Sequence, residues 1–90
     1  MPGVAYTLSD LALNGLLACA GADFRRVVAA FEQLALDANA PGVFALRDGA
    51  NRPLHQLRTG RFVILFYPRI ADLPPYIVDL VELRDHSPFR

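Results

Sequence analysis

Apolar residues recur along this chain with two different periods, and each period predicts a type of element. From Phe24 to Ala35 the apolar side chains lie three or four residues apart, which is the spacing of one face of an α-helix. On this face we expect Phe24, Val27, Phe31 and Leu34 to be buried against the sheet. This helix is expected to begin near Asp23, whose carboxylate can cap it, and to run to about Asn39. Pro41 and Gly42 follow and stop it.

A shorter helix is predicted before it, from about Asp10 to Ala20, with Gly21 at its end. Its buried stripe is expected to contain Leu13, Leu16 and Leu17, while Gly15 weakens it by about 1 kcal/mol relative to alanine. Thr7 and Asp10 have the spacing of a capping box. The segment from Val4 to Leu8 is short enough for an edge strand.

The second half of the chain predicts strands. Six large apolar residues in a row, Phe62 to Tyr67, indicate a buried central strand. Pro53 to Leu57 alternates apolar and polar side chains before it, and Thr59-Gly60 is a tight link between the two. After a proline-rich bend, Tyr76 to Leu83 forms the last strand.

Residues 43–53 are harder to interpret. Val43 to Leu46 can begin a further short strand, and Arg47 to Asn51 has the composition of a turn. The predicted order is therefore β-α-α-β-β-β, with one extra short strand near residue 44 as a variant. Two consecutive helices followed by consecutive strands indicate an α+β fold, a single domain over residues 1–90 in which a helical hairpin packs on a mainly antiparallel sheet.

Composition narrows the class of protein. No segment approaches the roughly 18 apolar residues of a membrane span, and the start of the chain lacks the layout of a signal peptide, so we expect a cytoplasmic protein with no membrane partner. The apolar content of 53% is high for a 90-residue chain, and part of it can cover a binding face. A domain of this size also has a narrow margin of stability, which a partner can widen.

Charge argues against a protein that coats nucleic acid, because the net charge is zero. The distribution is uneven: residues 1–50 carry a net charge of −2 and residues 51–90 a net charge of +2. All nine basic residues are arginine, which suits forked contacts to carboxylate or phosphate. The candidate cationic surface, for a polyanion or an acidic partner, contains Arg58, Arg61, Arg69, Arg84 and Arg90, with His55 and His86 nearby. The alternative explanation, which the composition favours slightly, is that these residues are solvated strand ends.

The sequence contains no residue pattern typical of metal binding, phosphate binding or nucleophilic catalysis. His55 and His86 are 31 residues apart, and with one cysteine they make no metal-ligand cluster, so we expect no metal and no cofactor. The glycines form no phosphate-binding loop. Ser9, Ser87 and the histidines make no convincing nucleophile set, and Cys19 is best interpreted as a buried thiol.

These segments resemble the RelE/ParE superfamily of bacterial toxins. The similarity lies in the short strand and two helices, in Leu57-Arg58-Thr59-Gly60-Arg61 leading into Phe62 to Tyr67, and in the ending with Arg84 and Phe89-Arg90. The helical portion from Leu8 to Pro41 is similar as well, so the resemblance covers nearly the whole chain. It implies the toxin of a type II toxin–antitoxin module, linked to growth inhibition and plasmid stabilisation, and a cognate antitoxin as partner.

The chain departs from the members that cleave RNA on the ribosome. Val63 stands where they place a catalytic arginine, and Leu54 to Gln56 stands where they place lysines. Phe89 stands at the position of their catalytic tyrosine and has no hydroxyl. Cleavage of RNA needs a base, an acid and cations, and only the cations are retained.

The sequence therefore favours a ParE-like toxin that acts by binding, with DNA gyrase as the target that the resemblance implies. Partner-binding residues would be Arg58, Arg61, Arg84, Phe89 and Arg90. One alternative is a ribosome-dependent mRNA interferase with a divergent site made of His55, Arg58, Arg61, Arg84 and His86. Another is a degenerate relative that has lost toxicity and survives as an interaction module.

Overall fold

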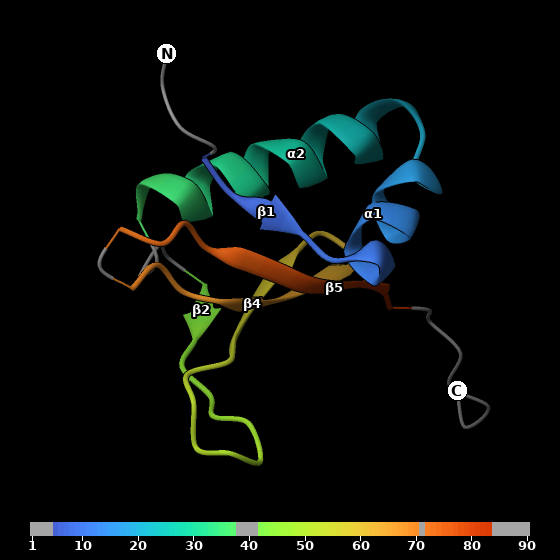
Figure 1. Cartoon of the computed structure of the whole chain (residues 1–90). Coiled ribbons are helices and arrows are strands. Elements are labelled where there is room, and N and C mark those ends of the chain that lie inside the picture. Colours follow the sequence, from blue (N-terminus) through green and yellow to red (C-terminus); the bar gives the residue numbers. More distant parts are fainter. Residues whose placement is uncertain (1–4, 38–41, 71, 84–90) are drawn as a thin grey trace, which may run out of the picture.

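The protein is an α+β domain of two layers, in which two helices cover one face of a five-stranded sheet (Figure 1). The computed structural model describes residues 5–37, 42–70 and 72–83. The elements are β1 (Thr7–Leu8), α1 (Asp10–Leu17), α2 (Gly21–Leu36), β2 (Val43–Phe44), β3 (His55–Thr59), β4 (Phe62–Tyr67) and β5 (Tyr76–Glu82). The predicted order is confirmed, and the variant with an extra short strand near residue 44 is the one observed.

The strands lie in the order β1-β5-β4-β3-β2, so the predicted central strand, β4, is in the middle of the sheet. Pairings from β2 to β5 are antiparallel, whereas β1 runs parallel to β5 at the edge. A two-residue loop joins β3 to β4, and its first residue, Gly60, has φ +58°, as the first central residue of a type II′ turn requires. The sheet is mainly antiparallel, as expected.

Pairing register divides the side chains of the sheet between two faces. Phe62, Ile64 and Phe66 of β4 are buried under the helices. The intervening side chains lie on the face without helices, which we call the open face. By register and alternation the open face contains Phe44, Gln56, Arg58, Val63, Leu65, Tyr67, Tyr76, Asp79 and Val81. A bulge interrupts the alternation of β5: Leu65 pairs with Asp79 and Phe66 with Ile77, so Val78 is the extra residue.

Helix α1 begins at a different cap from the predicted one. Ser9, and not Thr7, is the N-cap, because its hydroxyl accepts a hydrogen bond from the Ala12 amide at 3.0 Å. The same hydroxyl donates to the Val78 carbonyl of β5, and the Ser9 amide donates to the Ile77 carbonyl at 2.9 Å. Ser9 therefore starts the helix and attaches it to the sheet.

Gly15 lets α1 approach β5. A Cβ atom at this position would lie 2.9 Å from the Leu80 carbonyl oxygen, closer than side-chain carbons come to backbone atoms. The glycine that weakens the isolated helix is therefore needed for the contact between helix and sheet. α1 ends at Leu17, three residues before the predicted end.

Helix α2 begins at Gly21, two residues before the predicted cap. Asp23 does not cap it; it lies in the first turn and pairs with Arg61. The helix ends at Leu36, with Asp37 as its C-cap, so both of its ends lie earlier in the chain than predicted. The expected end at Asn39 lies outside the described residues.

The core lies between the helices and the helix-covered face of the sheet. Of the helix residues predicted to be buried, Leu16, Val27, Phe31 and Leu34 are in the core. Leu13, Leu17 and Phe24 are not: their exposed fractions are 41%, 67% and 39%. In α1 the narrow buried stripe contains Ala12 and Leu16, because α1 packs mainly against one strand. No helix in the described parts of the chain is long and apolar enough to cross a membrane.

Candidate functional site

The residues of the predicted cationic surface lie in different environments. Arg58 pairs in register with Val63 and lies exposed on the open face. His55, three residues earlier, pairs with Phe66 and lies on the helix-covered face. Side chains that are an odd number of positions apart along a strand point to opposite faces of the sheet. Arg58 and His55 therefore do not contact each other.

His55 is a packed residue. Its ring lies edge-on to Phe66, with centroids 5.8 Å apart and an interplanar angle of 87°. The Nδ1 atom is buried and has no hydrogen-bond partner among the residues that the structure describes.

Arg61 is held by two carboxylates. Its Nη2 atom lies 2.5 Å from Asp23 Oδ2 at the start of α2, and its Nε atom lies 2.6 Å from Glu82 Oε2 at the end of β5. The hydrogen bond to Glu82, followed by the charge of Asp23, raises the pKa of Arg61 above its ordinary value. The arginine thus joins the turn after β3 to both α2 and β5.

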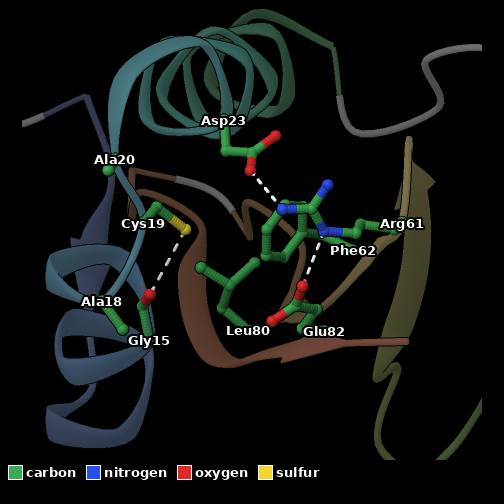
Figure 2. Close-up of a pocket in the computed structure, with 9 residues that line it drawn as sticks. All are labelled: Gly15, Ala18, Cys19, Ala20, Asp23, Arg61, Phe62, Leu80 and Glu82. Atoms are coloured by element: carbon green, nitrogen blue, oxygen red, sulfur yellow. Dashed lines mark hydrogen bonds and ion pairs between the residues drawn. The ribbon is translucent and has the colours of Figure 1, made fainter. Parts of the chain in front are cut away.

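A pocket of about 300 Å³ lies beside this arginine, between the last turn of α1, the start of α2, and strands β4 and β5 (Figure 2). Gly15, Cys19, Phe62 and Leu80 are among its lining residues. Arg61 lies against Phe62, with its Cζ atom 5.4 Å from the ring centroid, and its two carboxylates also line the pocket. The pocket was not anticipated from the sequence.

Cys19 faces this pocket as a neutral thiol. Its Sγ donates to the Gly15 carbonyl at 3.4 Å. Burial, followed by the charges of Asp23 and Glu82, raises the pKa of the thiol above its ordinary value. Since the thiolate is the reactive form, this environment disfavours a nucleophile.

The open face presents an aromatic pair next to an organised loop. The rings of Tyr67 and Tyr76 are stacked, with centroids 6.5 Å apart and an interplanar angle of 6°. The Arg52 guanidinium lies 5.2 Å from the Tyr67 centroid. Asp48 accepts hydrogen bonds from the Arg52 amide and side chain and from the Tyr67 hydroxyl.

These hydrogen bonds shift two pKa values in opposite directions. The Arg52 amide is the largest cause that lowers the pKa of Asp48 from 3.8 to about 2. The hydrogen bond to Asp48 raises the pKa of Tyr67 above its ordinary value. An ionised Asp48 and a protonated Tyr67 therefore form a stable pair over a wide pH range.

The remaining predicted site residues, Arg84, His86, Phe89 and Arg90, lie outside the described residues. Arg69 is exposed after β4. In the described ranges, no three His, Cys, Asp or Glu side chains group in a way that could hold a metal ion.

The ion pairs of Arg61 were missed because their partners are 38 and 21 positions away in sequence. One signal was present: Asp23 was recognised as a polar residue at a helix start. An acidic residue at this place can either cap the helix or lie in its first turn, where its negative charge stabilises the positive end of the helix. Asp23 does the second.

Comparison with known proteins identifies a shared architecture. No protein-family model matches the chain, and no curated protein matches it. Among solved structures, the chain is similar to one described as the archaeal RelE–RelB complex from Pyrococcus horikoshii OT3, with a TM-score of 0.74 at 16% sequence identity. The match covers 91% of this chain and 96% of that chain. The fold of this protein, two helices on one face of a five-stranded mixed sheet, is therefore RelE-like, as the resemblance predicted.

Proposed function

We propose that the protein is the toxin component of a type II toxin–antitoxin module and that it is RelE-like. The observation that carries the proposal is the structural match with a toxin solved together with its antitoxin, at a TM-score of 0.74 over nearly the full length of both chains. The resemblance in the sequence points independently to the same superfamily.

The structural neighbour favours the RelE-like alternative over the ParE-like one, and nothing in the comparison supports gyrase as the target. The proposed target is therefore messenger RNA on the ribosome. Of the divergent set, Arg58 suits a phosphate contact best, because it is exposed and has no ion-pair or hydrogen-bond partner among the described residues. A cation there would stabilise the negative charge that develops during cleavage.

The ParE-like function remains the second candidate because of specific residues. Val63 and Phe89 replace the arginine and tyrosine of the RNA-cleaving members, and His55 is packed against Phe66 on the face opposite Arg58. A binding toxin needs none of these groups.

A messenger-cleavage assay separates the two candidates. Purified protein added to a reconstituted translation system should cut ribosome-bound messenger, and Arg58→Ala should slow cutting by roughly 10²-fold, the order of loss for one preorganised donor. Arg25→Ala, at an exposed arginine of α2 outside the candidate cationic surface, is the matched control and should cut normally. Intact messenger together with inhibited gyrase supercoiling would favour the ParE-like function instead. Inactivity in both assays and no effect on growth would indicate a non-toxic interaction module.

The antitoxin partner can be tested separately. Co-expression with the product of the adjacent gene should raise solubility and melting temperature, because a ligand that binds only the folded state stabilises it by about 4 kcal/mol at 1,000 times its dissociation constant. An acidic antitoxin segment would lie against Arg58, so Arg58→Glu should weaken the complex. A protein that remains monomeric and unchanged in melting temperature beside its neighbour would count against the module.

A further inference from the structure

We propose that the pocket between α1, α2 and β5 binds the side chain of an arginine or lysine from a partner polypeptide. Its lining combines an apolar interior with an excess of negative charge. The pocket shares Arg61 with the candidate cationic surface, but its lining is negatively charged overall, and the proposal does not depend on the toxin assignment.

The charge of the pocket follows from the pairing of Arg61. One arginine faces two carboxylates, Asp23 and Glu82, and the neutral Cys19 thiol adds no charge, so the lining is net negative by one. Each carboxylate uses one oxygen for Arg61 (Figure 2). Asp23 Oδ1 and Glu82 Oε1 accept no bond from the described parts of the chain. Two acceptors therefore remain for a second cation.

The end of α1 adds to this preference. Its last turn lines the pocket through Gly15 and Ala18 and contains no basic residue. The carbonyl end of a helix carries partial negative charge and favours a nearby cation. The start of α2 has the opposite polarity, but Asp23 in its first turn already offsets it.

The interior suits the aliphatic part of a long basic side chain. Phe62 and Leu80 are buried residues that line the pocket with apolar surface. Arginine and lysine bury their methylene groups on such surfaces while the charged head stays near polar atoms. At about 300 Å³ the pocket is at the small end of ligand sites and suits one side chain.

Two exposed leucines that are next to lining residues in the chain favour a polypeptide over a free amine. Leu17 precedes the lining residue Ala18, and Leu83 follows the lining residue Glu82; both leucines are exposed. Residues flanking an inserted arginine would cover them, giving an apolar contact around a charged anchor.

The test uses the full chain and two probes that differ in charge. N-acetyl-arginine amide and its neutral isostere N-acetyl-citrulline amide are titrated while the amide NMR signals of Cys19 and Glu82 are followed. We expect the arginine probe to bind about two- to fivefold more tightly than the citrulline probe, which is the effect of one exposed ion pair. It should also slow modification of Cys19 by a neutral thiol reagent.

Variants make the test specific. Glu82→Gln should remove most of the preference for arginine over citrulline, and the Asp23→Asn/Glu82→Gln pair should reverse it, so that N-acetyl-glutamate amide binds better than the arginine probe. Glu32→Gln, which removes an exposed carboxylate of α2 near Tyr6, is the matched control and should bind as wild type. Amide dispersion checks that each variant is folded, and the wild-type probe comparison stands even if the double variant unfolds.

Three results would overturn the inference: equal binding of arginine and citrulline probes, stronger binding of the acidic probe to the wild type, or an unchanged preference in folded Glu82→Gln. Since neither antitoxin nor ribosome is present, such a failure leaves the proposed toxin function untouched. A failed cleavage assay likewise leaves this site untouched.

Discussion

Asp48 is a single side chain that organises the loop between β2 and β3. Its two oxygens accept from the amides of Ala50 and Arg52, from the Arg52 side chain and from Tyr67, at 2.8 to 2.9 Å. The loop thereby places Arg52 over the Tyr67 ring at one end of the open face. A change at Asp48 should therefore affect both the loop and the aromatic pair.

The lowered pKa of Asp48 predicts acid sensitivity. The folded pKa is about 2 and the ordinary value is 3.8, so the unfolded chain binds more protons between these values. The stabilisation by Asp48 is present above about pH 4 and is lost as pH falls through 2. In melting curves at pH 6 and pH 2.5, Asp48→Asn should differ from wild type more at pH 6. Asp72→Asn, at an exposed position, is the control; an equal difference at both pH values for Asp48→Asn would contradict the role.

The sequence predicted which residues of the site are exposed better than it predicted which residues contact each other. It correctly marked Arg58 and Arg61 as exposed, but Arg61 binds Asp23 and Glu82, and these contacts depend on how α2 and β5 meet the turn. Alternation along β3 was visible, and it already implied that His55 and Arg58 face opposite ways. Three-dimensional proximity between distant segments carries no local signal, so the pocket was not predictable.

At the scale of elements, the sequence predicted the first residues of the helices least accurately. Thr7 and Ser9 both have hydroxyls near the start of α1, and the choice depends on β5, whose Val78 carbonyl accepts the Ser9 hydroxyl. Hydrophobic periodicity, in contrast, located α2 and β4 well. The buried face of α2 gives apolar residues at helical spacing, and the central strand β4 gives a continuous apolar run. The parallel pairing of β1 is long-range and was not foreseen.

Removal of the Ser9 hydroxyl tests this cap. Ser9→Ala leaves the Ala12 amide without its partner and breaks the link to Val78, so the free energy of unfolding should fall by about 0.5–2 kcal/mol. Thr7→Val removes the hydroxyl of the other cap candidate and should cost less than about 0.5 kcal/mol, since Thr7 is exposed. Urea titration measures both; a larger loss for Thr7→Val would reverse the assignment.

Gly15 tests the contact between α1 and β5. Gly15→Ala improves the helix propensity by about 1 kcal/mol, yet its Cβ would lie 2.9 Å from the Leu80 carbonyl oxygen. Overpacking of this kind costs about 1–3 kcal/mol, so the variant should be less stable overall. Gly49→Ala, where a Cβ meets no atom within 4 Å, is the control and should be neutral. A stabilised Gly15→Ala would show that α1 can move away from the sheet.

On the scale of the whole molecule, the helices within residues 5–37, 42–70 and 72–83 all lie on one face of the sheet. The open face includes Phe44, 63% exposed, and Val81, 41% exposed, beside the half-buried Val63 and Leu65. Part of the apolar excess noted in the composition is thus at the surface. Gln56 and Arg58 of β3 lie between Phe44 and the apolar residues of β4, so the face combines apolar and polar side chains. Exposed apolar area of this kind favours association of the free protein.

Self-association of the isolated protein should therefore depend on this face. Sedimentation at rising concentration should show association that Phe44→Ser/Val81→Thr reduces, with a change in stability of about 0.5 kcal/mol or less. Leu36→Ser, on the 85%-exposed leucine at the end of α2, is the control and should associate as wild type. If Leu36→Ser alone prevents association, the helices and not the open face make the contact.

Because β1 pairs with β5, the fold cannot be completed during synthesis until β5 has left the ribosome. Ser9 forms a hydrogen bond with Val78, 69 positions later in the chain, and α1 packs against Leu80. β1 and α1 therefore cannot form their contacts with the sheet until β5 has been synthesised. Closing such long loops slows folding, and until then β4 is an uncovered apolar edge. Chains interrupted before β5 are therefore substrates for chaperones and proteases, and not smaller versions of the same domain.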